Sequence, residues 1–214
     1  EDFNPELQVK ADNPTKESAS VLKLNKTKDF ATGIYPYHIM ESTFSPLDKK
    51  SHAMKVTASV HEWCGQAFMQ VNNREDLEVK IHSYFESIAD KELQLDQALM
   101  ENEVWNLLRI NPESELFDVE KMIPSLEYLR LRHRKTKAYP VDIRQKSVND
   151  TMITTFDYTS LNRTLKIKQE AKFPYEILGW EESITDNGKT KTTSAKRLES
   201  MRSAYWNQNK PEFS

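Results

Sequence analysis

Polar and apolar residues alternate along many segments of this chain. Val56, Ala58 and Val60 are separated by single polar residues, and the same period of two recurs in the segments 77–86, 152–158, 165–167 and 173–180. Successive side chains of a strand point to opposite faces, so this period predicts strands with one packed and one solvated face. The chain is therefore predicted to be mainly β.

Turn residues divide the alternating segments into separate strands. Asp186-Asn187-Gly188 is the clearest signal, because an Asn-Gly pair suits a type I′ hairpin. A polar stretch at 72–76 predicts a second hairpin, and 45–50 a turn. We expect strands at 20–24, 34–44, 53–63, 66–71, 77–87, 125–134, 138–144, 151–159, 161–169, 173–183 and 189–196.

The segment 95–110 has a different pattern, in which leucines and a valine recur among good helix formers. This spacing predicts one or two helical segments. Asp96 is the expected N-cap, and Asn111-Pro112 the expected end.

Together these elements predict a β-rich α+β fold. It is an antiparallel meander of about eight to ten strands, curled into a barrel or a half-barrel, with a helical insertion near 95–110. Residues 1–19 are expected to be a polar lead-in, 20–206 a single β-rich domain and 207–214 a tail. Either curled form offers a concave face, and small ligands usually bind at concave faces.

Composition narrows the functional classes. The 30 basic and 33 acidic residues give a formal net charge of −3, so neither nucleic acid nor an anionic membrane is an expected partner. The single cysteine, Cys64, excludes an internal disulfide and a cysteine-based zinc site. The chain begins at Glu1 without a methionine and is expected to be a trimmed or mature form.

The segment 61–66 holds a histidine, an acid and a thiol within four residues. On a regular strand His61 and Cys64 point to opposite faces, so only a bulge at Gly65 would bring them together. We expect instead that Gly65 marks a bend, that Trp63 packs, and that Cys64 is a buried, inert thiol.

Arg130, Arg132 and Arg134 alternate along one expected strand. Such a stripe fits a carboxylate or a phosphate, and it equally fits cross-strand ion pairs. We favour the ion pairs. Their expected partners are Glu78, Glu86, Glu170 and Glu176.

Aromatic residues are spread through the chain, and they either line an apolar cavity or form the core of a sheet folded over a helix. The candidate ligand-binding residues are Trp63, Tyr84, Arg130, Arg132 and Trp180.

Motifs of catalysis are absent from the sequence. It has neither a glycine-rich phosphate loop nor a nucleophile elbow. None of the five histidines has a local partner at metal-ligand spacing. We therefore expect no catalytic residues, no metal and no cofactor, and a non-catalytic protein rather than an enzyme.

The wording of the segments 61–66, 82–86, 130–133 and 174–181 resembles a group of uncharacterised proteins from flavobacteria and their relatives. The resemblance spans about residues 21–180. Members often bear the name septum formation inhibitor Maf, and many resemble exported lipoproteins at their N-termini. The resemblance therefore implies the periplasmic side of the cell envelope, with a lipid anchor on the full-length form.

True Maf proteins are nucleotide pyrophosphatases with an S-x-S-P-R-R loop after the first strand. The nearest segment here, 42–46, is followed by Leu47 and Asp48 instead of two arginines. The cations that would hold a triphosphate are missing.

Three hypotheses follow. The first is a non-catalytic envelope protein that binds an apolar or amphiphilic small ligand in its sheet. The second is a structural or protein-interaction module without a ligand. The third, which we disfavour, is a Maf-type nucleoside triphosphate pyrophosphatase.

Overall fold

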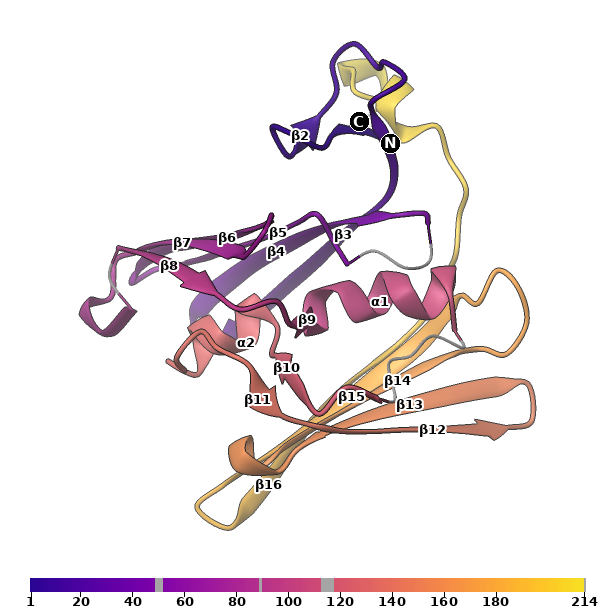
Figure 1. Ribbon diagram of the computed structural model, residues 1–214. Helices are drawn as coiled ribbons and strands as arrows, with labels where there is room; N and C mark the ends of the chain where they lie inside the picture. Colours follow the sequence, from indigo (N-terminus) through magenta and orange to yellow (C-terminus); the bar gives the residue numbers. More distant parts are fainter. Residues whose placement is uncertain (49–51, 89, 113–117, 214) are drawn as a thin grey trace.

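The computed structural model describes residues 1–48, 52–88, 90–112 and 118–213. Figure 1 shows three layers, with a sheet above and a sheet below a central layer that holds two helices. The buried apolar core joins residues of both sheets to residues of both helices. The prediction of a mainly β fold is therefore confirmed.

The upper sheet has eight strands in the order β2-β1-β3-β4-β5-β6-β7-β8, and all its neighbours are antiparallel. Its strands are β1 (Asp2–Asn4), β2 (Val9–Lys10), β3 (Ala19–Thr32), β4 (Tyr35–Pro46), β5 (Lys55–Glu62), β6 (Gly65–Asn73), β7 (Leu77–Ser83) and β8 (Lys91–Leu95). A 3-10 turn, η1 (Glu86–Ile88), lies between the last two strands.

The lower sheet is a five-stranded antiparallel meander. It comprises β12 (Asp142–Val148), β13 (Thr151–Tyr158), β14 (Arg163–Glu170), β15 (Ile177–Asp186) and β16 (Lys189–Lys196), with η3 (Thr159–Leu161) after β13. The last hairpin turns where predicted, because Asn187 and Gly188 both adopt positive φ angles of 49° and 72°.

A three-stranded sheet joins the helical layer to the lower sheet, in the order β11-β10-β9. Its strands are β9 (Leu99–Met100), β10 (Lys121–Ile123) and β11 (Tyr139–Pro140), and β9 runs parallel to β10. Among the described residues no strand of the upper sheet pairs with the lower sheet, so the two sheets enclose the helices without closing into a barrel.

The central helix, α1, spans Glu101–Ile110 and begins later than predicted. Residues 91–95 form β8, and the first helical residue follows Met100 rather than Asp96. The backbone N–H of Met100 donates to the buried carboxylate of Glu103 at 2.9 Å. This bond satisfies a donor at the helix start, where the helix has no backbone partner to offer.

The predicted strand at 125–134 is wrong, because α2 (Leu126–Leu131) occupies it. The Ser125 side chain accepts from the N–H of Tyr128 and caps the helix. Leu126 and Leu129, three residues apart, are both fully buried. The arginines at 130, 132 and 134 indicated a strand by their alternation, but the buried leucines follow the helical spacing.

The lead-in and the tail also contain regular structure. β1 and β2 lie within residues 1–19, and Phe3 is fully buried with its ring 5.0 Å from that of Phe44. The C-terminal residues include η4 (Tyr205–Asn207) and η5 (Pro211–Phe213). In Figure 1 the yellow C-terminal segment passes from the lower sheet beside α1 toward the level of β2.

Candidate functional site

Three of the predicted site residues gather near the β5–β6 turn. Trp63 is 63% exposed, with its ring 5.2 Å from that of Tyr35. Tyr84 is 72% exposed and lies against Gly65, where an added Cβ would stand 2.7 Å from the tyrosine ring. Arg130 is buried, with its guanidinium 4.0 Å from the centre of the Phe85 ring. Of the three, only Arg130 is buried, so the prediction that Trp63 packs is wrong.

Cys64 lies in the same turn and is exposed, so the prediction of a buried thiol is wrong. In this turn the Cys64 side chain faces solvent. The backbone N–H of Cys64 donates to the carboxylate of Glu62 at 2.7 Å. This carboxylate raises the pKa of the Cys64 thiol, which disfavours the reactive thiolate.

The arginine stripe does not exist as a stripe, because the residues lie on α2 and the turn after it. Arg130 lies 3.6 Å from the carboxylate of Glu62, and Arg132 forms an ion pair with Asp186. The expectation of ion pairs is met for these two, with partners other than the four glutamates predicted.

Trp180, the fifth predicted residue, lies apart from the others, between the two large sheets. On β15 it follows Gly179, where an added Cβ would stand only 2.4 Å from the backbone oxygen of Ala195 on β16. Because only glycine permits this close approach, the sequence Gly-Trp sets the position of the ring. The Nζ of Lys28 lies 4.8 Å from the centre of the Trp180 ring.

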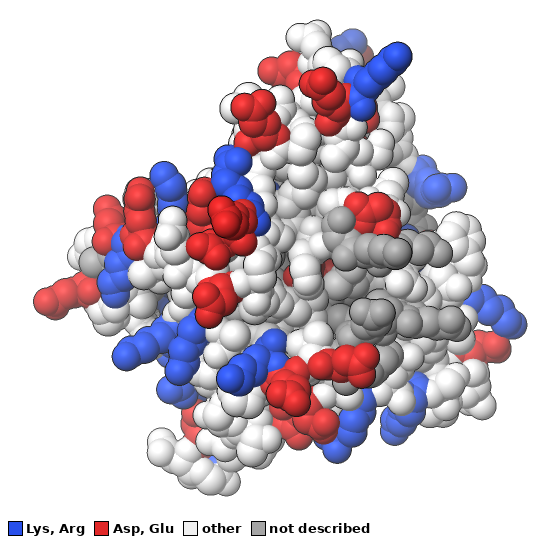
Figure 2. All heavy atoms as spheres, in the orientation of Figure 1, with Lys and Arg blue, Asp and Glu red and all other residues white. Residues whose placement is uncertain are grey.

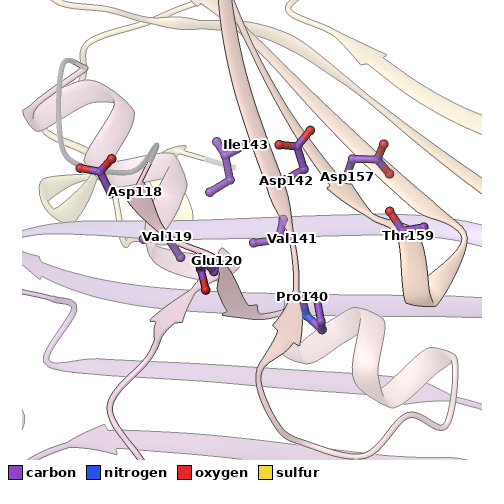
Figure 3. Close-up of a pocket in the computed structure, with 9 residues that line it drawn as sticks. All are labelled: Asp118, Val119, Glu120, Pro140, Val141, Asp142, Ile143, Asp157 and Thr159. Atoms are coloured by element: carbon purple, nitrogen blue, oxygen red, sulfur yellow. The ribbon is translucent and has the colours of Figure 1, made fainter.

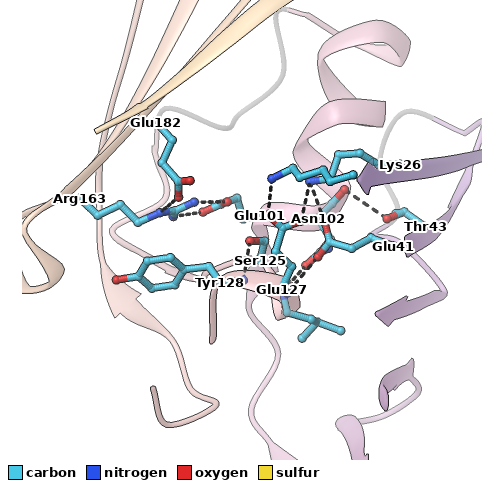
Figure 4. Close-up of polar contacts among 12 residues, drawn as sticks. Lys26, Glu41, Thr43, Glu101, Asn102, Ser125, Glu127, Tyr128, Arg163 and Glu182 are labelled. Carbon is cyan, nitrogen blue, oxygen red and sulfur yellow. Dashed lines mark hydrogen bonds and ion pairs between the residues drawn. The ribbon is translucent and has the colours of Figure 1, made fainter. Parts of the chain in front are cut away.

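Beside Trp180, a network of buried charges joins the layers (Figure 4). In its upper half, Lys26 on β3 contacts Glu41 on β4 at 2.6 Å and Glu127 on α2 at 4.0 Å. Lys28 forms an ion pair with Glu127. Asn102 on α1 donates to Glu41 at 2.7 Å.

The lower half of the network centres on Arg163 of β14. Its guanidinium donates two parallel bonds to Glu101 of α1, at 2.5 Å and 2.7 Å, and a third to Glu182 at 2.6 Å. Tyr158 donates to the same Glu101 at 2.8 Å. The guanidinium also lies 4.3 Å from the centre of the Tyr128 ring. Such forked pairs fix geometry as well as charge.

The pKa values of the buried acids differ with their partners. Burial alone would raise the pKa of Glu101 and Glu41, but Arg163 and Lys26 respectively hold both below the ordinary value. Glu127 is different: burial and the nearby Glu41 raise its pKa, although Lys26 and Lys28 act against them.

A groove of about 460 Å³ opens beside this network. Its walls come from β3, α1, β15 and the segment after β16. The lining residues are Leu24, Asn25, Lys26, Trp105, Asn106, Arg109, Glu176, Ile177, Trp180, Arg197, Ser200, Met201 and Arg202. The two tryptophans line both the groove and the small space within the network.

The network positions both tryptophans. The Nζ of Lys26 lies 4.9 Å from the centre of the Trp105 ring, as Lys28 lies over Trp180. Each lysine is held in turn by a glutamate, so the two rings rest on fixed cations. The indole N–H of Trp105 is buried and has no acceptor among the described residues.

A second pocket, of about 520 Å³, is acidic (Figure 3). Asp118, Glu120, Asp142 and Asp157 line it, but Arg144 lies 3.1 Å from Asp142 and 3.4 Å from Asp157. Within the described ranges no group of three or more His, Cys, Asp or Glu side chains is placed to hold a metal ion. The groove beside Trp180 is therefore the better candidate.

Comparison with known proteins adds no assignment. No protein-family model, curated protein or solved structure matches this chain. The segment 42–46, compared above with the Maf loop, lies within β4 and pairs along its length with β3. The function must therefore be argued from the groove itself.

Proposed function

We propose that the protein binds a small ligand with an apolar body in the groove between Trp105 and Trp180, and that its role is binding rather than catalysis. The single observation that carries this proposal is the pair of tryptophans that line one opening, each fixed by a lysine. Leu24, Ile177 and Met201 extend the apolar lining. Ligand sites of this kind combine apolar walls with a few fixed polar groups.

The volume and the depth of the groove support a small molecule. About 460 Å³ lies within the range of ordinary ligand pockets, which is about 300–1,000 Å³. Trp105 is only 8% exposed, and Trp180 is half-buried. A ligand that covers the exposed part of Trp180 removes apolar surface from water, which favours binding by about 25 cal/mol per Å².

The test begins with native mass spectrometry of the purified protein, compared with its denatured mass. An added mass of lipid or metabolite size supports the proposal and identifies the ligand. Trp180→Ala should then abolish most of the added mass. The matched control is Trp63→Ala, which removes an exposed tryptophan outside the groove and should leave ligand binding unchanged. Equal loss in both variants, or a bare mass throughout, contradicts the proposal.

The second candidate is a protein-interaction module, and one observation favours it. Ile34, Trp63 and Tyr84 are 76%, 63% and 72% exposed at neighbouring ends of the upper sheet. Exposed apolar clusters mark interaction surfaces. If the purified protein carries no ligand, loss of binding to a partner in Trp63→Ala would favour this second role.

The location stays a prediction from the sequence resemblance, which implies the cell envelope and a lipid anchor. No helix in the described part of the chain is long and apolar enough to cross a membrane. On the face drawn in Figure 2, acidic and basic side chains are interspersed rather than separated by sign. That no nucleic acid is a partner also stays a prediction.

A further inference from the structure

The groove is basic although the protein as a whole is acidic. Among the described residues that line it, four are cations, Lys26, Arg109, Arg197 and Arg202, and one, Glu176, is an acid. The whole chain has a formal net charge of −3. A cationic lining in an acidic protein draws anions to that opening.

Two of the four cations are neutralised from within the protein. Lys26 contacts Glu41 at 2.6 Å. Arg197 contacts Glu176 at 2.5 Å and Glu170 at 3.0 Å. These pairs are part of the fold and offer little charge to a ligand.

The other two cations, Arg109 and Arg202, form no side-chain hydrogen bond or ion pair with any described residue. Arg109 lies in the last turn of α1, where a cation interacts favourably with the helix dipole even without a ligand. That explanation does not extend to Arg202, which lies on an irregular segment beyond β16. Both side chains line the one groove that also presents Trp105 and Trp180.

We infer that the ligand carries a single anionic headgroup, a carboxylate or a phosphate monoester, which Arg109 and Arg202 bind while its apolar body lies against Trp180 and the small exposed part of Trp105. The inference rests on the proposed function and specifies its ligand. Guanidinium groups match both headgroups, since their planar N–H forks donate two parallel bonds to carboxylate or phosphate oxygens. Because Arg202 belongs to the C-terminal segment, that segment supplies half of the anion site.

The experiment compares four probes that share one twelve-carbon chain: dodecanoate, dodecyl phosphate, dodecanol and dodecyltrimethylammonium. Binding is followed by tryptophan fluorescence below the concentrations at which the probes form micelles. We expect at least one of the two anions to bind about tenfold more tightly than dodecanol, and the cation to bind least. Raising the salt concentration should reduce this preference. The better of the two anions identifies the headgroup.

The variant Arg109→Gln/Arg202→Gln should lose this preference, with affinity for dodecanol unchanged. Arg134→Gln is the matched control, since Arg134 is an exposed arginine outside the groove. All substituted positions are exposed, so folding should be retained, and far-UV circular dichroism checks it.

The failures of the two proposals are distinguishable. Equal binding of dodecanol and both anions, or a preference that survives the double substitution, overturns the anion site but leaves the proposed function standing. No binding of any probe, together with a bare native mass, overturns both.

Discussion

Glu41 and Glu127 approach the same lysine, yet their pKa values shift in opposite directions. Glu41 accepts from Asn102, from the backbone N–H of Glu127 and from Lys26, so its charged form is favoured. Glu127 lies 4.0 Å from Lys26 and is penalised by burial and by Glu41. The pKa values of these two glutamates therefore differ because more hydrogen-bond donors surround Glu41 than Glu127.

Glu41→Gln should lower the free energy of unfolding by about 3 kcal/mol, because it leaves Lys26 without its main partner. Glu127→Gln also removes the partner of Lys28, but it should cost less, since burial and Glu41 already penalise the charged form of Glu127. The two variants retain side-chain volume and serve as controls for each other. Urea unfolding followed by tryptophan fluorescence measures both. A larger loss in Glu127→Gln than in Glu41→Gln would contradict this account.

The stability difference between wild type and each of these two variants should depend on pH in opposite directions. The pKa of Glu41 is lowered, so its stabilising contribution is present above its ordinary value of 4.5 and is lost as the pH falls through the lower value of the folded state. The pKa of Glu127 is raised, so wild type loses stability relative to Glu127→Gln as the pH rises from 4.5 through the raised value.

At the scale of elements, α1 is a helix in which four of the five polar residues are buried, all except Arg109. Asn102 and Asn106 are each 2% exposed, and Asn106 donates to the backbone of Leu22 and to Ser45 of the upper sheet. At the other end, Gln169 of the lower sheet donates to the carbonyl of Leu108 at 2.8 Å. Both sheets thus satisfy polar groups of the helix between them.

Gln169→Leu should lower the free energy of unfolding by about 1–3 kcal/mol. The carbonyl of Leu108 cannot be satisfied within the helix, because the residue four positions later is Pro112, which has no N–H. Gln145→Leu, on β12 of the same sheet, is the matched control, since it removes only a half-buried bond to Thr154. Similar losses in both variants would show that the helix end has another partner.

The element scale also separates what the sequence predicts from what it does not. Alternation predicted strands such as β5, β7 and β14 because each has one packed face. It failed for α2, whose six residues are too few to distinguish a helical spacing from an alternating one. Helix α1 was expected, but the burial of its polar residues was not, since its periodicity does not show a sheet on both sides.

The buried network could not be predicted from the sequence, because its partners are far apart in the chain. Glu101 and Arg163, for example, are 62 residues apart. A signal was nevertheless present. Arg163 shares its strand face with Leu165, Ile167 and Gln169, and all four are buried. Glu41 likewise lies two residues after the buried Ile39, on the same face of β4. A charge at an inward position of an alternating strand predicts a buried partner, although it does not say which.

At the scale of the whole molecule, the C-terminal segment adds a wall to the groove and little to the core. Every side chain from 198 to 213 is exposed. Arg197 is the last residue held by the lower sheet, where its backbone N–H donates to Leu178 and its side chain pairs with two glutamates. The fold should therefore tolerate loss of the segment that the groove requires.

A chain that ends at Arg197 should unfold cooperatively, with stability within about 1 kcal/mol of the full chain, because no buried side chain is removed. A chain that ends at Lys196 also lacks the pairs of Arg197 with Glu170 and Glu176, and should lose about 1 kcal/mol more. Thermal unfolding by circular dichroism compares the two. Collapse of the longer chain would mean that the segment is part of the core.

The layered arrangement has a consequence for folding kinetics. The upper sheet is built from residues 2–95 and the lower sheet from 142–196, and nearly all strand neighbours in each are consecutive in sequence. Each sheet can therefore form from local hairpins, whereas the ion pair of Lys28 with Glu127 in the network joins residues 99 positions apart. We expect such contacts to form late, when the layers meet. The network then governs how long the folded state lasts rather than how fast it is reached.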